Sequence, residues 1–193
     1  MPDDTSADAR KRRPPRADAL RNRQRVLSAA REAFAAEGPS VSLDDIARRA
    51  GVGAGTVHRH FPTKDELLKA VIVDRLEELT VAARGFVDAA DPGQAFFAFL
   101  RQLAAESRHN LAVSAALTDP SNVGDVLEAG RGLQEAVTVL LSRAQAAGAV
   151  RPDIDADELH AIIAGALAME QRLPPGSQGL GLTVIIDGLR VVA

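Results

Sequence analysis

The chain has 193 residues, of which 46% are hydrophobic and 25% charged, and it contains no cysteine. This length allows one large domain or a small domain joined to a larger one, and the composition excludes wholesale disorder. The lack of cysteine excludes disulfides, thiolate metal sites and a cysteine nucleophile. No apolar stretch approaches the roughly 20 residues that cross a bilayer, and the N-terminus lacks the apolar run of a secretory signal. We therefore expect a soluble, cytoplasmic protein with no membrane partner.

The net charge of −3 hides an uneven distribution along the chain. Residues 1–64 contain 13 Lys/Arg against 8 Asp/Glu, a balance of +5, whereas residues 65–193 contain 10 against 18, a balance of −8. The densest basic part, Arg10–Arg25, holds eight basic residues and one acid. Such asymmetry is typical of a protein with one end facing nucleic acid, although a basic terminus can also serve solubility alone.

Residues 1–16 are predicted to form a disordered basic arm, because they are polar, charged and interrupted by two prolines. From about Asp18 an amphipathic pattern predicts the first helix, and Gly38 followed by proline predicts its end. The apolar residues that share one stripe of this helix are Val26, Leu27, Ala30 and Phe34.

A second, short helix is predicted to begin after Ser42, because Ser42-x-x-Asp45 has the form of a capping box. This helix should end at Gly51, a residue suited to the positive φ of a chain reversal. A third short helix, AGTVHRHF, follows the turn. Residues 42–61 therefore indicate a helix–turn–helix motif, with the second helix of the motif placed to enter the major groove of DNA.

The remaining two-thirds of the chain is also predicted to be helical. Thr63-x-x-Glu66 opens a long fourth helix, and Asp155-x-x-Glu158 opens a later one. Residues 184–186 have the propensity of a strand, but a lone strand has nothing to pair with. We therefore expect an all-α protein.

The run IARRAGVGAGTVHRHFPTKDELL, residues 46–68, resembles the DNA-binding domain of the TetR/AcrR family of bacterial transcriptional regulators. The resemblance covers about residues 20–70 and includes LSAAREAFAAEG, S-x-D-D-I-A, G-V-x-x-G-T and H-F-P-T-K-D-E-L-L in the same order and spacing. It implies a helix–turn–helix DNA-binding domain over residues 17–66 and a helical ligand-binding and dimerisation domain over residues 67–193.

The resemblance also implies roles for individual residues. Thr56 and Lys64 stand where the family contacts the DNA backbone, and His58 stands where the family most often has tyrosine. An imidazole can also donate to phosphate, but it is shorter and can become charged near neutral pH. The residues expected to contact DNA are Ser42, Gly53, Ala54, Gly55, Thr56, His58, Arg59, Lys64, Arg21 and Arg23.

Other chemistry is less well supported. His58 and His60 lie two residues apart, about 200° around a helix, whereas two metal ligands on one helix are typically spaced i,i+4. The paired acids Asp44 and Asp45 complement the dipole at the start of a helix, which explains them without acid–base catalysis. We therefore expect no metal, no cofactor and no enzymatic activity.

By resemblance, we expect a homodimeric repressor that binds double-stranded DNA at a palindromic operator and is released by a small-molecule effector. Candidate effector contacts are Phe96, Phe97, Arg101, His109 and Gln134, although the phenylalanines can equally be core. The last two helices, at about 156–172 and 180–192, should form the dimer interface through Ile162, Ile163, Ala166, Val184, Ile185 and Leu189. A helical protein-interaction module, or a ligand carrier without specific DNA binding, is the alternative.

Overall fold

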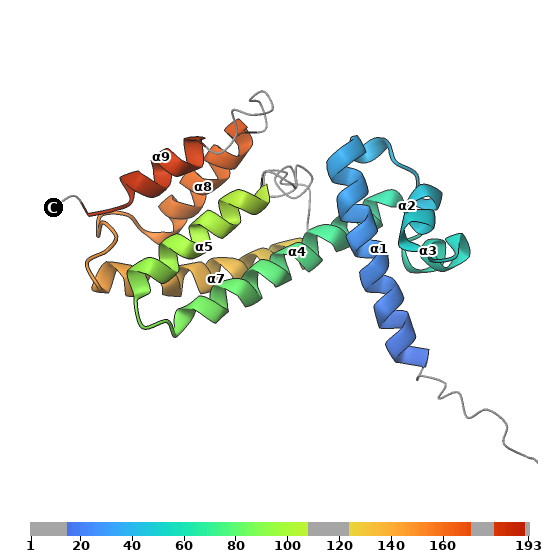
Figure 1. The fold of residues 1–193 in the computed structure, drawn as a ribbon, viewed down its shortest axis with the longest axis horizontal. Coiled ribbons are helices and arrows are strands. Elements are labelled where there is room, and N and C mark those ends of the chain that lie inside the picture. Colours follow the sequence, from blue (N-terminus) through green and yellow to red (C-terminus); the bar gives the residue numbers. More distant parts are fainter. Residues whose placement is uncertain (1–14, 108–123, 171–179, 192–193) are drawn as a thin grey trace, which may run out of the picture.

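The computed structural model describes residues 15–107, 124–170 and 180–191, and within these ranges the chain is helical, as predicted (Figure 1). One isolated antiparallel bridge joins Val150 to Arg190. The helices, in chain order, are α1 (Pro15–Glu37), the 3-10 helix η1 (Gly38–Ser40), α2 (Leu43–Ala50), α3 (Ala54–His60), α4 (Lys64–Val87), α5 (Pro92–Ser107), α7 (Asp125–Ala146), α8 (Ala156–Glu170) and α9 (Leu180–Gly188).

Two of the predicted capping boxes form in full. At the start of α4, the backbone N–H of Glu66 donates to Thr63 Oγ1 at 3.2 Å, and the N–H of Thr63 donates to Glu66 Oε2 at 3.3 Å. Asp155 and Glu158 make the same reciprocal pair before α8, at 2.8 and 2.9 Å. Each box satisfies backbone donors that the first turn of a helix leaves without a partner.

Two of the predicted boundaries fall inside helices. Helix α1 begins at Pro15, and the rest of the predicted arm lies outside the described residues. The predicted boundary between residues 66 and 67 falls within the first turn of α4, which runs unbroken from Lys64 to Val87. The division of the chain at that point therefore stays a prediction.

A first hydrophobic cluster, here called the head core, joins α1, α2, α3 and the start of α4. Ala30, Ala33, Ile46 and Leu67 are its fully buried members. The buried residues of the head core are Val26, Leu27, Ala29, Ala30, Ala33, Phe34, Val41, Ile46, Ala47, Ala50, Val57, Phe61, Leu67 and Val71.

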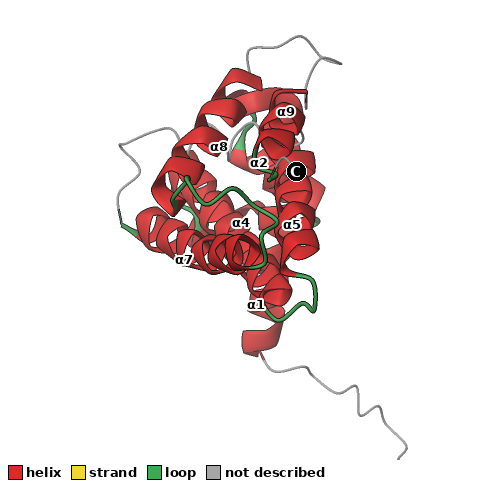
Figure 2. Ribbon diagram, turned by 90° about the vertical axis from the view of Figure 1, so that its left-hand side faces the viewer, coloured by secondary structure: helices red, strands yellow, loops and turns green. Residues whose placement is uncertain are grey.

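A second cluster, here called the larger core, joins the end of α4 to α5, α7, α8 and α9, which pack as a bundle (Figure 2). Phe96 and Phe99 are fully buried there. Residues 184–186 lie in α9. The buried residues of the larger core are Ala83, Phe96, Phe97, Phe99, Leu100, Ala104, Ala136, Leu140, Leu141, Ala144, Val150, Ile154, Leu159, Ile163, Ala166, Leu182, Ile186 and Leu189.

Helix α4 runs from the head core to the larger core, and α1 crosses it (Figure 1). A polar contact joins the two helices at this crossing, because Glu78 of α4 accepts from Arg31 of α1 at 2.9 Å. Arg75, on α4 itself, donates to the same carboxylate at 2.6 Å. A small apolar cluster of Ile72, Leu76 and Val126 joins α4 to α7 between the two cores. The helix–turn–helix end is therefore attached to the bundle through packed contacts along one helix.

Candidate nucleic-acid interface

The turn between α2 and α3 is built around Gly51. This residue has φ 61° and ψ 38°, the left-handed conformation in which glycine is favoured. Its carbonyl accepts a hydrogen bond from Arg25 Nη2 at 3.2 Å. A Cβ at this position would lie 2.6 Å from the same Nη2 atom. Backbone conformation and the approach of Arg25 therefore both explain a glycine here.

Apolar residues on the inner faces of α2 and α3 set the orientation of the motif. Ile46 and Ala47 of α2 and Val57 of α3 are buried in the head core, and Phe61 closes it where α3 ends. With Val57 held inward, the rest of α3 faces outward. The exposed residues of this surface are Gly53, Ala54, Gly55, His58, Arg59 and His60.

The small residues at the start of α3 are not explained by the packing of the protein itself. Gly53 has φ −62°, and an added Cβ would meet only Thr56 Oγ1, at 3.9 Å. An added Cβ at Gly55 would meet nothing within 4 Å. Gly53 is the N-cap of α3, whereas Gly55 lies inside the helix, where a glycine costs about 0.5–1 kcal/mol relative to alanine. The small size of these residues therefore leaves the backbone accessible to another molecule.

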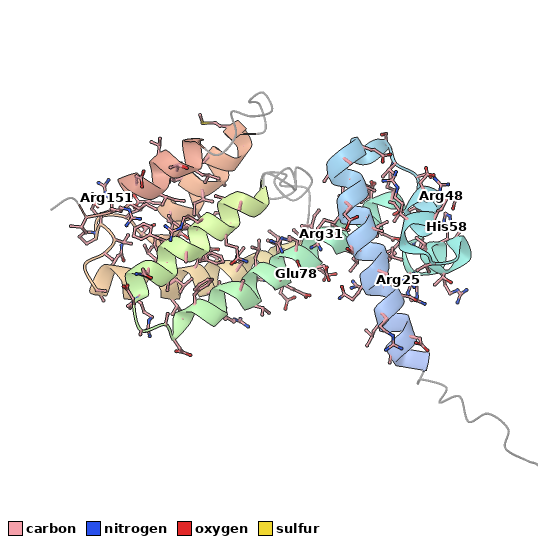
Figure 3. All side chains as sticks on the ribbon, in the orientation of Figure 1. Arg25, Arg31, Arg48, His58, Glu78 and Arg151 are labelled. Carbon is pink, nitrogen blue, oxygen red and sulfur yellow. The ribbon has the colours of Figure 1, made fainter. Side chains whose placement is uncertain are left out.

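An ionisable pair joins the two helices on this exposed surface. His58 Nε2 of α3 lies 2.9 Å from Asp44 Oδ1 of α2, and the two side chains are 50% and 72% exposed. His58 is labelled on α3 in Figure 3. The sequence pattern explains Asp44 by the helix dipole alone and does not indicate this contact. The two residues are 14 positions apart, so only the folded arrangement of α2 and α3 brings them together.

Ser42 and its neighbours form a second polar group at the start of α2. The N–H of Asp45 donates to Ser42 Oγ at 3.1 Å, and the Ser42 hydroxyl donates to Asp45 Oδ2 at 2.7 Å. The Ser42 hydroxyl and the guanidinium of Arg48 hold the pKa of Asp45 below its ordinary value. Because the charged form of Asp45 is favoured in the folded chain, its contacts stabilise the fold at neutral pH, and this stabilisation is lost as the pH falls through the acid range.

The predicted basic contacts have different surroundings. Arg21 forms an ion pair with Asp18 on α1, and the Arg23 guanidinium lies 6.0 Å from the centre of the Phe61 ring. Arg59 is exposed on α3, and Lys64 is the first residue of α4 and partly exposed. Thr56 is partly buried on α3. The structure thus places all ten candidate DNA contacts on α1, α3, the start of α4 and the cap of α2.

The candidate effector contacts that the structure describes have different surroundings. Phe96 and Phe97 are buried in the larger core, and Arg190 lies over the Phe97 ring at 4.1 Å. Arg101 is exposed, and Gln134 donates to Asp157 at 2.7 Å. His109 lies outside the described residues. Their assignment to an effector stays a prediction.

An open groove of about 520 Å³ lies where α8 and α9 meet the loop before α8. Three residues predicted for the dimer interface line it, namely Ile162, Ile185 and Leu189. Ile162 and Val184 are exposed. Ile163, Ala166 and Leu189 are buried in the larger core of one chain. The full set of groove residues is Arg151, Asp153, Ile154, Glu158, Ala161, Ile162, Ile185, Gly188 and Leu189.

Comparison with known proteins decides the family. The model for bacterial regulatory proteins of the tetR family matches residues 26–71, and the model for the SbtR-like transcriptional regulator C-terminal domain matches residues 91–191. A solved TetR transcription regulatory protein from Mycobacterium vanbaalenii is 42% identical, with a TM-score of 0.70, over 92% of this chain and 100% of that one. The chain belongs to the TetR family. It is therefore a transcriptional regulator with a DNA-binding helix–turn–helix, and its fold is not that of an enzyme.

Two curated relatives of this TetR-family chain match over shorter segments. The HTH-type regulator TtgW from Pseudomonas putida is 48% identical over 64 residues, which are 33% of this chain and 48% of that protein. The HTH-type repressor LfrR from Mycolicibacterium smegmatis is 40% identical over 72 residues, which are 37% of this chain and 35% of that protein. The matched segment therefore spans less than half the length of each relative.

Within the described residues, no helix is both long and apolar enough to cross a bilayer.

Proposed function

We propose that this TetR-family protein is a homodimeric repressor that binds a palindromic operator and is released by a small-molecule effector. The observation that carries the proposal is the exposed start of α3, where neither backbone conformation nor internal packing requires the glycines at positions 53 and 55. A major groove accepts a helix whose first residues are small enough for the backbone to approach the bases. Repression is supported by the relative LfrR, which is named a repressor.

The proposed DNA surface combines this exposed helix with donors on its flanks. Thr56, His58, Arg59 and Lys64 supply hydroxyl, imidazole, guanidinium and ammonium groups on the same end of the molecule. Such groups fix a protein on phosphates, whereas contacts to base edges and DNA shape give sequence specificity. Gly53, Ala54 and Gly55 bring no side-chain donors, so we assign specificity to Arg59, the basic arm and DNA shape.

The proposed dimer uses the surface of α8 and α9. Ile162, Val184 and Met169 are exposed at 39%, 63% and 71%, although large apolar side chains are usually covered. Exposed small residues, Ala161 and Gly165 among them, allow a second helix pair to approach closely. A two-fold axis along this surface would bring the same residues of two chains together and give two DNA-binding ends.

Val184→Asp tests this surface. An aspartate at an exposed position leaves the fold of one chain intact, but in a dimer it would place two unpaired charges in an apolar interface. We expect the dimer mass of the wild type in sedimentation analysis to fall to that of a monomer. Val81→Asp, at a position on α4 that is 70% exposed, is the matched control and should stay dimeric. A monomeric wild type would contradict the proposed dimer.

Lys64→Ala tests the assignment of a phosphate contact. Because an ammonium held near phosphate acts on every sequence alike, operator and scrambled DNA should lose affinity by the same factor. The slope of log affinity against log salt should fall by about one per DNA-binding unit. Fluorescence anisotropy across a salt series measures both quantities. Unchanged affinity and slope would show that Lys64 does not touch DNA.

Selection of binding sites from random DNA tests the function as a whole. The proposal predicts an enriched palindrome with two half-sites, one for each protomer. A screen of small molecules by thermal shift then identifies effectors, since a ligand that binds only the folded state raises its apparent stability. An effector found in this way should lower affinity for the selected operator. Selection that enriches no common sequence would contradict the proposal.

A further inference from the structure

The Asp44–His58 pair stands on the surface that the proposed function places against DNA. Its atoms, His58 Nε2 and Asp44 Oδ1, are 2.9 Å apart, and both side chains are at least half exposed. Neither residue belongs to the head core. The pair is therefore not explained by packing, and it places a carboxylate on a face that meets phosphates.

Other charged groups near the turn between α2 and α3 bind residues other than Asp44 and His58. Arg48, one helical turn after Asp44, donates to Asp45 at 2.5 Å. Arg25 of α1 donates to the carbonyl of Gly51. The charged or titratable groups on the two helices that carry the pair are, besides His58, Asp44, Asp45, Arg48 and Arg49 of α2 and Arg59 and His60 of α3.

The chemistry of an imidazole constrains what His58 can do while it holds Asp44. If Nε2–H donates to the carboxylate, a neutral ring carries only a lone pair on Nδ1, and this lone pair repels a phosphate oxygen. A charged ring carries N–H on both nitrogens and can donate to the carboxylate and to a phosphate together. In such a complex the charged ring would lie between two anions, the Asp44 carboxylate and the phosphate. A phosphate contact through Nδ1 therefore requires a proton from solvent.

We propose that His58 is a proton-linked phosphate contact and that Asp44 is its positioning residue. When DNA binds, the ring of His58 takes up one proton (H⁺) from the solvent at Nδ1 and donates it in a hydrogen bond to a phosphate, while Nε2–H remains hydrogen-bonded to Asp44. This proposal rests on the proposed DNA-binding function. Phosphodiesters keep their charge at neutral pH, whereas histidine changes its charge between about pH 5 and pH 8. Affinity for DNA should therefore rise as the pH falls through this range.

The test is anisotropy with the full chain and its selected operator, between about pH 6 and pH 8 at constant ionic strength. If each DNA-binding end takes up one proton, the association constant should rise by up to about tenfold for every pH unit by which the pH falls, counted for each end. His58→Gln should remove this dependence, and its affinity should fall below that of the wild type at the acid end of the range, because the phosphate contact through Nδ1 is lost. His60→Gln, two residues further on the same helix, is the matched control and should retain the dependence. An equal pH dependence in wild type and His58→Gln would overturn the proposal.

Asp44→Asn separates positioning from a structural role. Asparagine keeps an acceptor oxygen for Nε2–H but removes the negative charge beside the ring that is protonated in the proposed complex. The rise in affinity should therefore move to lower pH, whereas loss of a purely structural contact would lower affinity equally at every pH.

The protonation of His58 can also be measured directly. In the complex of the wild type with DNA, the ring ¹⁵N shifts of His58 should show protons on both nitrogens. One unprotonated nitrogen would contradict the proposal. Failure to discriminate operator from scrambled DNA at any pH would instead contradict the proposed function.

Discussion

Gly55→Leu is expected to weaken specific DNA binding without destabilising the protein. No atom lies within 4 Å of an added Cβ at this position, and leucine has a higher helix propensity than glycine. The folded chain should therefore be as stable as wild type or about 0.5–1 kcal/mol more stable. A bulky side chain between α3 and the groove would hold the helix away from the bases.

The size of this loss follows from the cost of forcing extra atoms into a packed contact. That cost is typically about 1–3 kcal/mol, which corresponds to a loss of roughly 5- to 150-fold in affinity. Calorimetry and anisotropy on the same preparation measure stability and binding. Gly85→Leu, in the exposed part of α4 where an added Cβ also meets nothing within 4 Å, is the matched control. Full binding by Gly55→Leu would show that α3 does not approach DNA closely.

Leu67→Ala and Leu159→Ala should damage different ends of the molecule by similar amounts. Both leucines are fully buried, Leu67 in the head core and Leu159 in the larger core. Removing a buried leucine side chain costs about 2–5 kcal/mol, because apolar contacts are lost and a cavity remains. Each variant should therefore lose a large part of the stability of one core.

The two variants should differ in function. Leu67→Ala loosens α3 and should weaken DNA binding while the protein stays dimeric. Leu159→Ala loosens α8 and should weaken the dimer, and with it binding to a palindrome, more than binding to a single half-site. Sedimentation analysis and anisotropy on full and half operators distinguish these results. Identical changes in both measurements would show that the two cores unfold as one unit.

The helix ends and the motif could be predicted from the sequence because local chemistry determines them. The capping box of Thr63 and Glu66 uses residues three positions apart, and both hydrogen bonds form as expected. Gly51 adopts the positive φ that its place in the turn predicts. Such signals depend on neighbours along the chain, so one sequence is sufficient to read them.

Contacts between helices could not be predicted in the same way. Asp44 satisfies a local rule at the start of α2, and nothing in its neighbourhood along the chain indicates that His58 lies 2.9 Å away. Phe96 and Phe97 fit both a pocket and a core by composition, and only the packing of α5 against the bundle shows that both are buried. The division between core, pocket and interface is a property of the packed bundle rather than of a local pattern.

The affinity ratio between the selected operator and a scrambled duplex of the same composition tests the central claim most directly. It should be measured by anisotropy with the full chain at roughly physiological salt, since affinity without a stated salt concentration has no clear meaning. A helix–turn–helix dimer that reads bases should prefer its operator by about a thousandfold or more. Equal affinity for the two duplexes would contradict the account of this protein as a sequence-specific regulator.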